Sequence, residues 1–176
     1  DVFAPIIHSS KKRSVWLGVN LITALIAVYF IGLFEATLQQ KIALAILMPV
    51  VASMGGIAGT QTLIIVTRGI ATGKVTTANI KALINKEVAV SGLNGIIWSL
   101  VIGLITYYWF SDLLLSLIIA LAIITNLIVA AFSGAFLPLL LSKLRIDPAL
   151  AGGVILTTIT DVIGFVAFLG LAALFI

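Results

Sequence analysis

One acidic residue lies deep inside a hydrophobic run of the sequence, in the stretch LTTITDVIGF at residues 156–165. Asp161 has no Lys, Arg or His within ten residues on either side. A charged side chain at the centre of a bilayer costs about 2.5–3.5 kcal/mol on insertion scales, so such residues are usually functional or paired. We therefore predict that Asp161 belongs to an ion or proton pathway, with a cation as its missing counter-charge. The alternative is a protonated Asp161 that forms a hydrogen bond with a Thr or Gln.

Helical spacing places a small and a polar residue on the face of Asp161. Residues at i, i+4 and i+7 of a helix share one face, and Thr157, Asp161 and Gly164 have this spacing. A second apolar run carries a similar stripe, formed by Ser53, Gly56 and Thr60. Polar stripes on two helices predict that these helices meet around water. The threonines alone would also fit internal hydrogen bonding or helix packing.

The second apolar run is rich in glycine, in the stretch MPVVASMGGIAGTQTLIIVTRG at residues 48–69. Gly55 and Gly59 have the small-xxx-small spacing that lets another helix approach closely. Alternatively, the glycines bare the backbone, so that carbonyl oxygens face a water-filled path. Gln61, which directly follows Thr60, favours a polar interior at this position.

The composition of this chain is that of a protein surrounded by lipid rather than by water. Of its 176 residues, 62% are hydrophobic and 9% are charged, whereas a soluble domain has about a quarter of its residues charged. Five apolar runs approach or exceed the roughly 20 residues that a membrane helix needs. They lie near residues 15–34, 42–67, 88–110, 113–141 and 151–176. The spans are predicted to be helices because an open strand would leave backbone groups unpaired in lipid. The predicted fold class is an all-α polytopic membrane protein with five transmembrane helices.

The distribution of basic residues predicts the orientation of these spans. Nine of the ten Lys and Arg residues fall on one side, and only Lys41 falls on the other. The nine are Lys11, Lys12, Arg13, Arg68, Lys74, Lys81, Lys86, Lys143 and Arg145. The positive-inside rule then places the N-terminus in the cytosol and Ile176 outside, in a protein of the cell membrane. The net charge of +4 is explained by this topology, so no nucleic-acid partner is expected.

The longest polar segment is GKVTTANIKALINKEVAV at residues 73–90, between the second and third spans. We predict an interfacial connector in which Thr76 or Thr77 caps a short helix that leads into the third span. The chain has no Cys, and its only His, His8, lies outside the predicted spans, so thiolate and imidazole metal ligands are lacking in them. An intramembrane aspartyl protease needs two carboxylates, whereas the predicted spans contain one, and we expect no enzyme.

Two motifs give the chain a family resemblance. MGGIAGTQTL at residues 54–63 resembles the GMGGNAGTQ signature of MgtE magnesium channels. FSGAFLPLLLSKLRIDPALAGGVILTTITDVIGF at residues 132–165 resembles their fourth and fifth spans, where GA-LP, DPA and TTLTD-TG recur. This chain departs from the family pattern at three positions. Ile57 replaces the signature Asn, Val154 replaces a frequent proline, and Gly153 replaces an asparagine found in some members, where its backbone carbonyl could substitute.

The resemblance covers essentially the whole chain and implies a homodimer whose pore runs along the two-fold axis. The second and fifth spans would line this pore, and Asp161 would bind hydrated Mg²⁺, the transported ion. Residues 1–13 would be the end of a cytosolic connecting plug helix that follows regulatory domains, and residues 14–176 would be the five-helix pore domain. A dimer is also expected from the residues, because one chain offers only one membrane carboxylate.

Three functions remain open at this stage. The leading expectation is a channel or transporter for Mg²⁺ or another divalent cation, lined by Ser53, Gly56, Thr60, Gln61, Gly153, Thr157 and Gly164. The first alternative is a proton-coupled cation exporter that uses Asp161 as a proton or ion relay. The second is a membrane anchor or assembly domain without transport.

Overall fold

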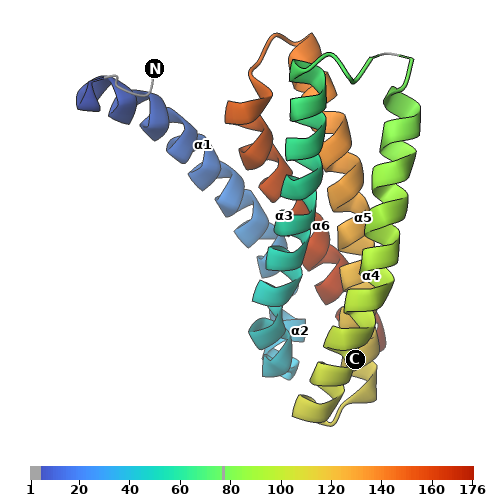
Figure 1. Ribbon diagram of the computed structural model, residues 1–176. Coiled ribbons are helices and arrows are strands. Elements are labelled where there is room, and N and C mark those ends of the chain that lie inside the picture. The colour runs from blue at the N-terminus through green and yellow to red at the C-terminus, as the bar shows by residue number, and fades with distance from the viewer. Residues whose placement is uncertain (1–4, 77) are drawn as a thin grey trace.

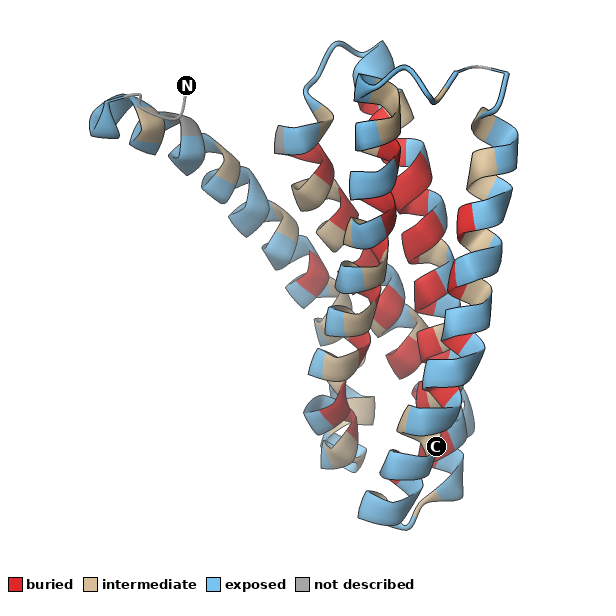
Figure 2. Cartoon of the chain, in the orientation of Figure 1, coloured by how far each residue is buried: buried red, intermediate tan, exposed pale blue. Residues whose placement is uncertain are grey.

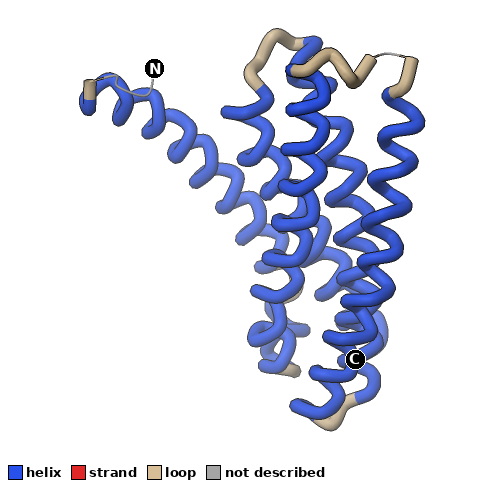
Figure 3. Tube along the Cα trace, viewed as in Figure 1, coloured by secondary structure: helices blue, strands red, loops and turns tan. Residues whose placement is uncertain are grey.

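The computed structural model describes residues 5–76 and 78–176, and the regular structure of these residues is entirely helical (Figures 1 and 3). The helices are α1 (Ile6–Gly32), α2 (Glu35–Gln40), α3 (Ile42–Ala71), α4 (Ile80–Phe110), α5 (Leu113–Lys143) and α6 (Pro148–Phe175). All but the short α2 are long and apolar enough to cross a membrane, which makes five candidate spans. The prediction of an all-α multi-pass membrane protein with five spans is therefore confirmed.

The membrane helices extend beyond the apolar runs that predicted them. α4 begins at Ile80 rather than at residue 88, and α1 begins at Ile6 rather than at residue 15. Hydropathy locates the part of a helix that lipid surrounds, whereas backbone hydrogen bonding continues the helix into polar sequence. α1 also runs without a break across the predicted domain boundary between residues 13 and 14.

The predicted cap of α4 is wrong for Thr76, and Thr77 lies outside the described residues. The residue before α4 is Asn79, and its side chain makes no capping hydrogen bond to the helix. Instead, Asn79 Oδ1 accepts from the backbone N–H of Thr76 at 2.8 Å, and Asn79 Nδ2 donates to the carbonyl of Lys74 at 2.8 Å. Asn79 thus closes the loop onto itself, and Thr76 is part of that closed loop rather than a helix cap.

α5 is the central helix of the bundle and is the most buried of the membrane spans. It packs against α3, α4 and α6, and the buried residues gather on these inward faces (Figure 2). The core includes Leu44 and Val51 of α3, Ile119 and Ile123 of α5, and Phe168 of α6. α1 packs mainly on α6 and leans away from the bundle toward its N-terminal end (Figure 1).

Glycines bring α3, α5 and α6 into close contact around Asn126 of α5. Asn126 is fully buried, and its Nδ2 donates to the carbonyl of Val51 at 2.9 Å. A Cβ on Gly55 would lie 2.2 Å from Asn126 Nδ2, so glycine is needed there. A Cβ on Gly59 would lie 2.9 Å from the Leu156 side chain. Gly55 and Gly59 therefore serve packing within the chain, as the small-xxx-small interpretation predicts.

Candidate functional site

The first half of α6 carries a stripe of half-buried residues that includes Asp161. Gly153, Thr157 and Asp161 follow one another at four-residue intervals and are all of intermediate exposure. A Cβ on Gly153 would meet no other atom within 4 Å, so there is open space in front of it. All three residues therefore remain partly accessible, and the described part of the chain does not bury this stripe.

α3 presents a second open stripe. Ser53 is exposed, Gly56 and Thr60 are of intermediate exposure, and a Cβ on Gly56 would also meet nothing within 4 Å. The neighbouring Gly55 and Gly59 are buried against α5 and α6. Within a single turn of α3, Gly55 and Gly59 therefore pack within the chain while Gly56 faces open space.

The packing between α3 and α6 sets the two stripes at matching heights. A Cβ on Gly152 would lie 3.0 Å from Leu63, one on Gly59 would lie 2.9 Å from Leu156, and one on Gly164 would lie 3.1 Å from Val51. The helices are thus antiparallel neighbours. Asp161 lies between the levels of the second and third contacts, where α3 carries Ser53 and Gly56.

The threonine hydroxyls of both stripes donate to their own helices. Thr60 Oγ1 donates to the carbonyl of Gly56 at 2.7 Å, and Thr157 Oγ1 donates to the carbonyl of Gly153 at 3.0 Å. The threonines therefore do form the internal hydrogen bonds of the alternative interpretation, but these bonds do not use all of the hydroxyl groups' bonding capacity. A hydroxyl that uses its proton internally still has oxygen lone pairs with which to accept or to ligate.

Asp161 itself makes no hydrogen bond or ion pair among the described residues, and the one salt bridge found there joins Lys41 and Asp112. The expected structural alternative, a hydrogen bond from a Thr or Gln to Asp161, is not present in that part of the chain. The described residues also contain no group of three His, Cys, Asp or Glu side chains that could hold a bare metal ion. One chain therefore offers an isolated carboxylate beside hydroxyl and carbonyl oxygens.

Two residues predicted to line the path lie elsewhere. Gly164 is buried, and a Cβ on it would lie 2.6 Å from Asn126 Nδ2, so it faces the packed centre of the chain rather than open space. Gln61 is exposed and lines a cavity of about 430 Å³ between α3 and α4. Gly164 was predicted from its helical spacing to Asp161, and Gln61 from its position directly after Thr60. The positions of the neighbouring helices separate both residues from the two stripes.

Sequence reasoning missed two buried polar residues in the spans. Glu87 of α4 is only 6% exposed, and Thr62 Oγ1 donates to its Oε2 at 3.3 Å. Asp161 is therefore not the only acid in the membrane helices, because α4 begins earlier than predicted and includes Glu87. Asn126 is fully buried, and its Oδ1 has no hydrogen-bond partner. The helical spacing of Glu87, Ser91 and Asn94 was the available signal for a second polar face.

Comparisons with known proteins show the family to which this chain belongs. The family model MgtE, described as a divalent cation transporter, matches residues 48–171, which include both stripes. A magnesium transporter MgtE of Bacillus subtilis is 35% identical over 168 residues, covering 96% of this chain and 37% of the relative. One from Thermus thermophilus is 31% identical over 160 residues, covering 90% of this chain and 35% of the relative. One from Enterococcus faecalis is 28% identical over 169 residues, covering 96% and 37%. The chain thus spans little more than a third of the length of these relatives.

Proposed function

This chain belongs to the MgtE family of divalent cation transporters, and from that premise we propose that it forms a membrane pathway for Mg²⁺ or a similar cation. The path runs between the stripes of α3 and α6, with Asp161 as its cation-binding residue. The observation that carries the proposal is the state of Asp161. It is a membrane carboxylate on an uncovered stripe, with no hydrogen bond or ion pair among the described residues.

The chemistry of the stripes suits a hydrated divalent cation. Mg²⁺ prefers oxygen ligands, dehydrates reluctantly and usually keeps several of its waters. A carboxylate beside the hydroxyls of Thr60 and Thr157 and the open backbone at Gly56 and Gly153 can hold such an ion through its water shell. The chain has no Cys to provide a soft ligand.

We propose a C2 homodimer as the functional unit. An isologous interface places the same surface of two subunits face to face, so two uncovered stripes would enclose one path. The two copies of Asp161 would then supply two negative charges to match a divalent ion. This arrangement also explains why a polar stripe on α6 is left uncovered by the chain's own helices.

The orientation and the setting of the domain belong to the same proposal. The N-terminus would lie in the cytosol and Ile176 outside, in the cell membrane, as the basic residues predict. Residues 1–13 would connect to cytosolic regulatory domains, which is consistent with the greater length of the relatives. An inside-negative potential would drive inward flux, because each charge gains about 2.3 kcal/mol per 100 mV and a divalent ion about twice that.

A proton-coupled exporter is the second candidate, because the membrane helices contain a second carboxylate, Glu87. Two membrane carboxylates, Asp161 on α6 and Glu87 on α4, are available for proton exchange. Such residues often form proton relays in pumps and transporters. A channel needs no such relay.

Ion flux into proteoliposomes tests these functions together. Purified protein is reconstituted around a fluorescent Mg²⁺ indicator, and Mg²⁺ is added outside under an inside-negative potential. We expect uptake that rises with the potential and needs no proton gradient. Uptake that appears only after a pH jump would support the exporter. A rate equal to that of empty liposomes under both conditions would leave only the anchor function.

A further inference from the structure

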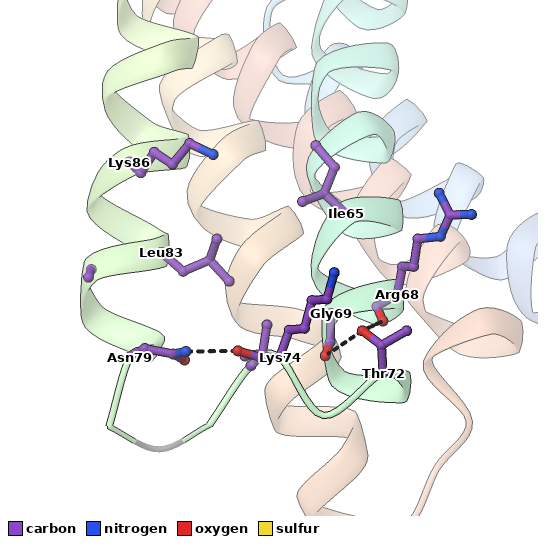
Figure 4. Close-up of a pocket in the computed structure, with 10 residues that line it drawn as sticks. Ile65, Arg68, Gly69, Thr72, Lys74, Asn79, Leu83 and Lys86 are labelled. Atoms are coloured by element: carbon purple, nitrogen blue, oxygen red, sulfur yellow. Dashed lines mark hydrogen bonds between the residues drawn. The ribbon is translucent and has the colours of Figure 1, made fainter.

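α3 and α4 are joined by a loop, yet α4 packs on α5 rather than along α3. A groove therefore lies between α3 and α4, on a different side of α3 from the proposed ion path. Its end beside the loop is a cavity of about 640 Å³ (Figure 4). The cavity is lined by basic side chains and by the apolar residues Ile65, Val75, Ala82 and Leu83.

Three basic residues from three different elements line this cavity. They are Arg68 of α3, Lys74 of the loop and Lys86 of α4. Figure 4 shows Lys74 and Lys86 reaching into the space between the helices, whereas the Arg68 side chain extends from α3 on the side turned away from α4. None of the three forms an ion pair with a carboxylate in the described part of the chain. The cavity thus concentrates positive charge that lacks a counter-ion.

The loop that carries Lys74 is held in place by the protein itself. The backbone N–H groups of Lys74 and Val75 donate to the carbonyl of Gly69 at 2.9 and 3.1 Å. A Cβ on Gly69 would lie 2.5 Å from Val75 Cγ2, so glycine permits this close approach. Asn79 Nδ2 closes the loop from the other side by donating to the carbonyl of Lys74. The cavity is therefore preorganised, which lowers the entropic cost of binding a ligand.

The lining of the groove changes from basic beside the loop, through polar, to entirely apolar at the far end. Beyond Ile65 lies the cavity of about 430 Å³ that contains Gln61, Thr62, Ser91 and Asn94. Glu87 lines it too, but it is only 6% exposed, and its Oε2 accepts a hydrogen bond from Thr62 Oγ1. Beyond that is a cavity of about 150 Å³ whose lining is entirely apolar: Val50, Met54, Trp98, Val101, Ile102, Ile105 and Ile123.

The length of the groove matches the depth of one lipid leaflet. Arg68 and Met54 are fourteen residues apart on α3, which is about 21 Å at 1.5 Å per residue. Half of a bilayer that measures roughly 40–45 Å with its head-group regions is about 20–22 Å. A ligand with an anionic head at the level of Arg68 and a long apolar body would follow the whole groove, whereas a free phosphate ion would use only its first cavity.

We propose that this groove binds an anionic phospholipid, with the phosphate beside Lys74 and Lys86, Arg68 at the rim of the cavity, and an acyl chain extending toward Trp98. Basic pockets between membrane helices are suited to anionic head groups, and hydrogen bonds from Arg or Lys to phosphate are strengthened by charge. The amides of Gln61 and Asn94 stand where the glycerol and ester oxygens would lie. The lipid would fill the space that α3 and α4 leave between them.

Quenching of Trp98 fluorescence tests the proposal directly. A Trp16→Phe, Trp109→Phe background leaves Trp98 as the only tryptophan, and the protein is reconstituted with phosphatidylcholine or phosphatidylglycerol carrying brominated acyl chains. We expect several-fold stronger quenching by the brominated phosphatidylglycerol at equal mole fraction. The triple variant Arg68→Gln, Lys74→Gln, Lys86→Gln should lose this preference. Lys81→Gln is the matched control, because Lys81 is exposed on α4 and does not line the cavity; it should keep the preference.

A second measurement separates lipid from free anion and guards against a misfolded variant. Thermal unfolding in neutral detergent is followed with phosphatidylglycerol, with phosphatidylcholine or with inorganic phosphate. Of the three additives, only phosphatidylglycerol should raise the unfolding midpoint of the parent protein. The triple variant should unfold at the parent's lipid-free midpoint, whether or not phosphatidylglycerol is present. Equal quenching by the two brominated lipids in the parent would overturn the proposal. Equal stabilisation by inorganic phosphate would identify a site for soluble anions and would overturn it too.

Discussion

Glu87 on α4 and Asp161 on α6 are both carboxylates in membrane-spanning helices, but their surroundings differ. Glu87 is 6% exposed and accepts a hydrogen bond from Thr62 at 3.3 Å. Asp161 is half-buried on an uncovered stripe and has no hydrogen bond or ion pair among the described residues. A buried acid that finds its donor within the fold is accounted for by the fold, since leaving it unsatisfied would cost free energy. An acid left without one is free to serve a ligand. The contrast separates a structural carboxylate from a candidate binding carboxylate without reference to their positions in the sequence.

The largest effect should come from removing the charge of Asp161. Asp161→Asn keeps the size of the side chain but loses the carboxylate that we propose attracts the cation. We expect Mg²⁺ flux into proteoliposomes to fall on the order of 10–100-fold, the range typical when a group that supports a metal site is lost. Folding should be unaffected, because an amide is less costly in lipid than a carboxylate.

Glu87→Gln is the matched control for that change, because it also converts a membrane acid into its amide. Its amide oxygen can still accept from Thr62, so flux should stay within about twofold of the parent, as for a change that removes no binding energy from the path. If both variants lose flux equally, the distinction between the two acids is wrong. If Asp161→Asn conducts like the parent, the proposed path fails at its centre.

The next largest effect is on thermal stability, and it should differ between a glycine that faces the packed centre and one that faces open space. Gly164→Ala places a Cβ 2.6 Å from Asn126 Nδ2, whereas Gly153→Ala meets nothing within 4 Å. Overpacking a well-packed interior costs about 1–3 kcal/mol, so Gly164→Ala should lower the thermal midpoint in detergent clearly. Gly153→Ala should leave the midpoint near that of the parent. Similar midpoints for the two variants would show that Gly164 does not belong to the packed centre.

A smaller effect is expected from the hydroxyl groups beside Asp161. Thr157→Val removes one hydroxyl from the proposed path, and a hydrogen bond contributes about 0.5–1.5 kcal/mol. Flux should therefore fall about two- to tenfold, with Asp161 intact. Thr158→Val is a close control. The hydroxyls of Thr157 and Thr158 both donate to the carbonyl of Val154, at 3.0 and 2.8 Å, but Thr158 lies beside the stripe. A loss of flux in Thr158→Val equal to that in Thr157→Val would point to a general effect on the helix.

The smallest effect is expected at Asp112, a carboxylate that lies between α4 and α5 rather than within a span. Asp112 accepts from the N–H of Leu115 at the start of α5 and pairs with Lys41, and these interactions, in that order, hold the pKa of Asp112 below its usual value. Because the pKa is lower in the folded state, the charged form stabilises the protein above the unfolded pKa. This contribution disappears as the pH falls through the folded-state pKa.

Thermal midpoints measured between pH 7 and pH 3 test this carboxylate. The parent should lose more stability on acidification than Asp112→Asn, by about 1 kcal/mol or less, as expected for a partly exposed pair. Asn is as good a helix N-cap as Asp, so the variant should differ little in its helix start. Identical pH profiles would show that the pair with Lys41 contributes nothing measurable.

The sequence predicted the spans well because lipid imposes a strict requirement. Every backbone group must be paired within the membrane, so a long apolar run can be assigned to a helix with little further information. Asp161 was found for the same reason, since a charge in lipid stands out from its surroundings. Glu87 was missed by one residue, because the predicted third span began at residue 88 while α4 begins at Ile80.

The roles of individual glycines could not be predicted in the same way. Gly55 and Gly56 are adjacent in the sequence, yet one packs against Asn126 and the other faces open space. Helical spacing states which residues share a face, but it does not state which helix will cover that face. Gly164 illustrates the limit, because its spacing relates it to Thr157 while α5 buries it. Such assignments depend on contacts between helices far apart in the sequence.

α1 has a mechanical consequence because it packs on α6 near one end only. Ala27 is buried at that end, whereas the helix continues to Ile6, 21 residues away and leaning clear of the bundle (Figure 1). At 1.5 Å per residue this arm is about 31 Å long. A rotation of about 5° at the packed end would therefore move the far end by nearly 3 Å, on this length. In the reverse direction, a small force applied near Ile6 acts with that leverage on α6, the helix that carries Asp161.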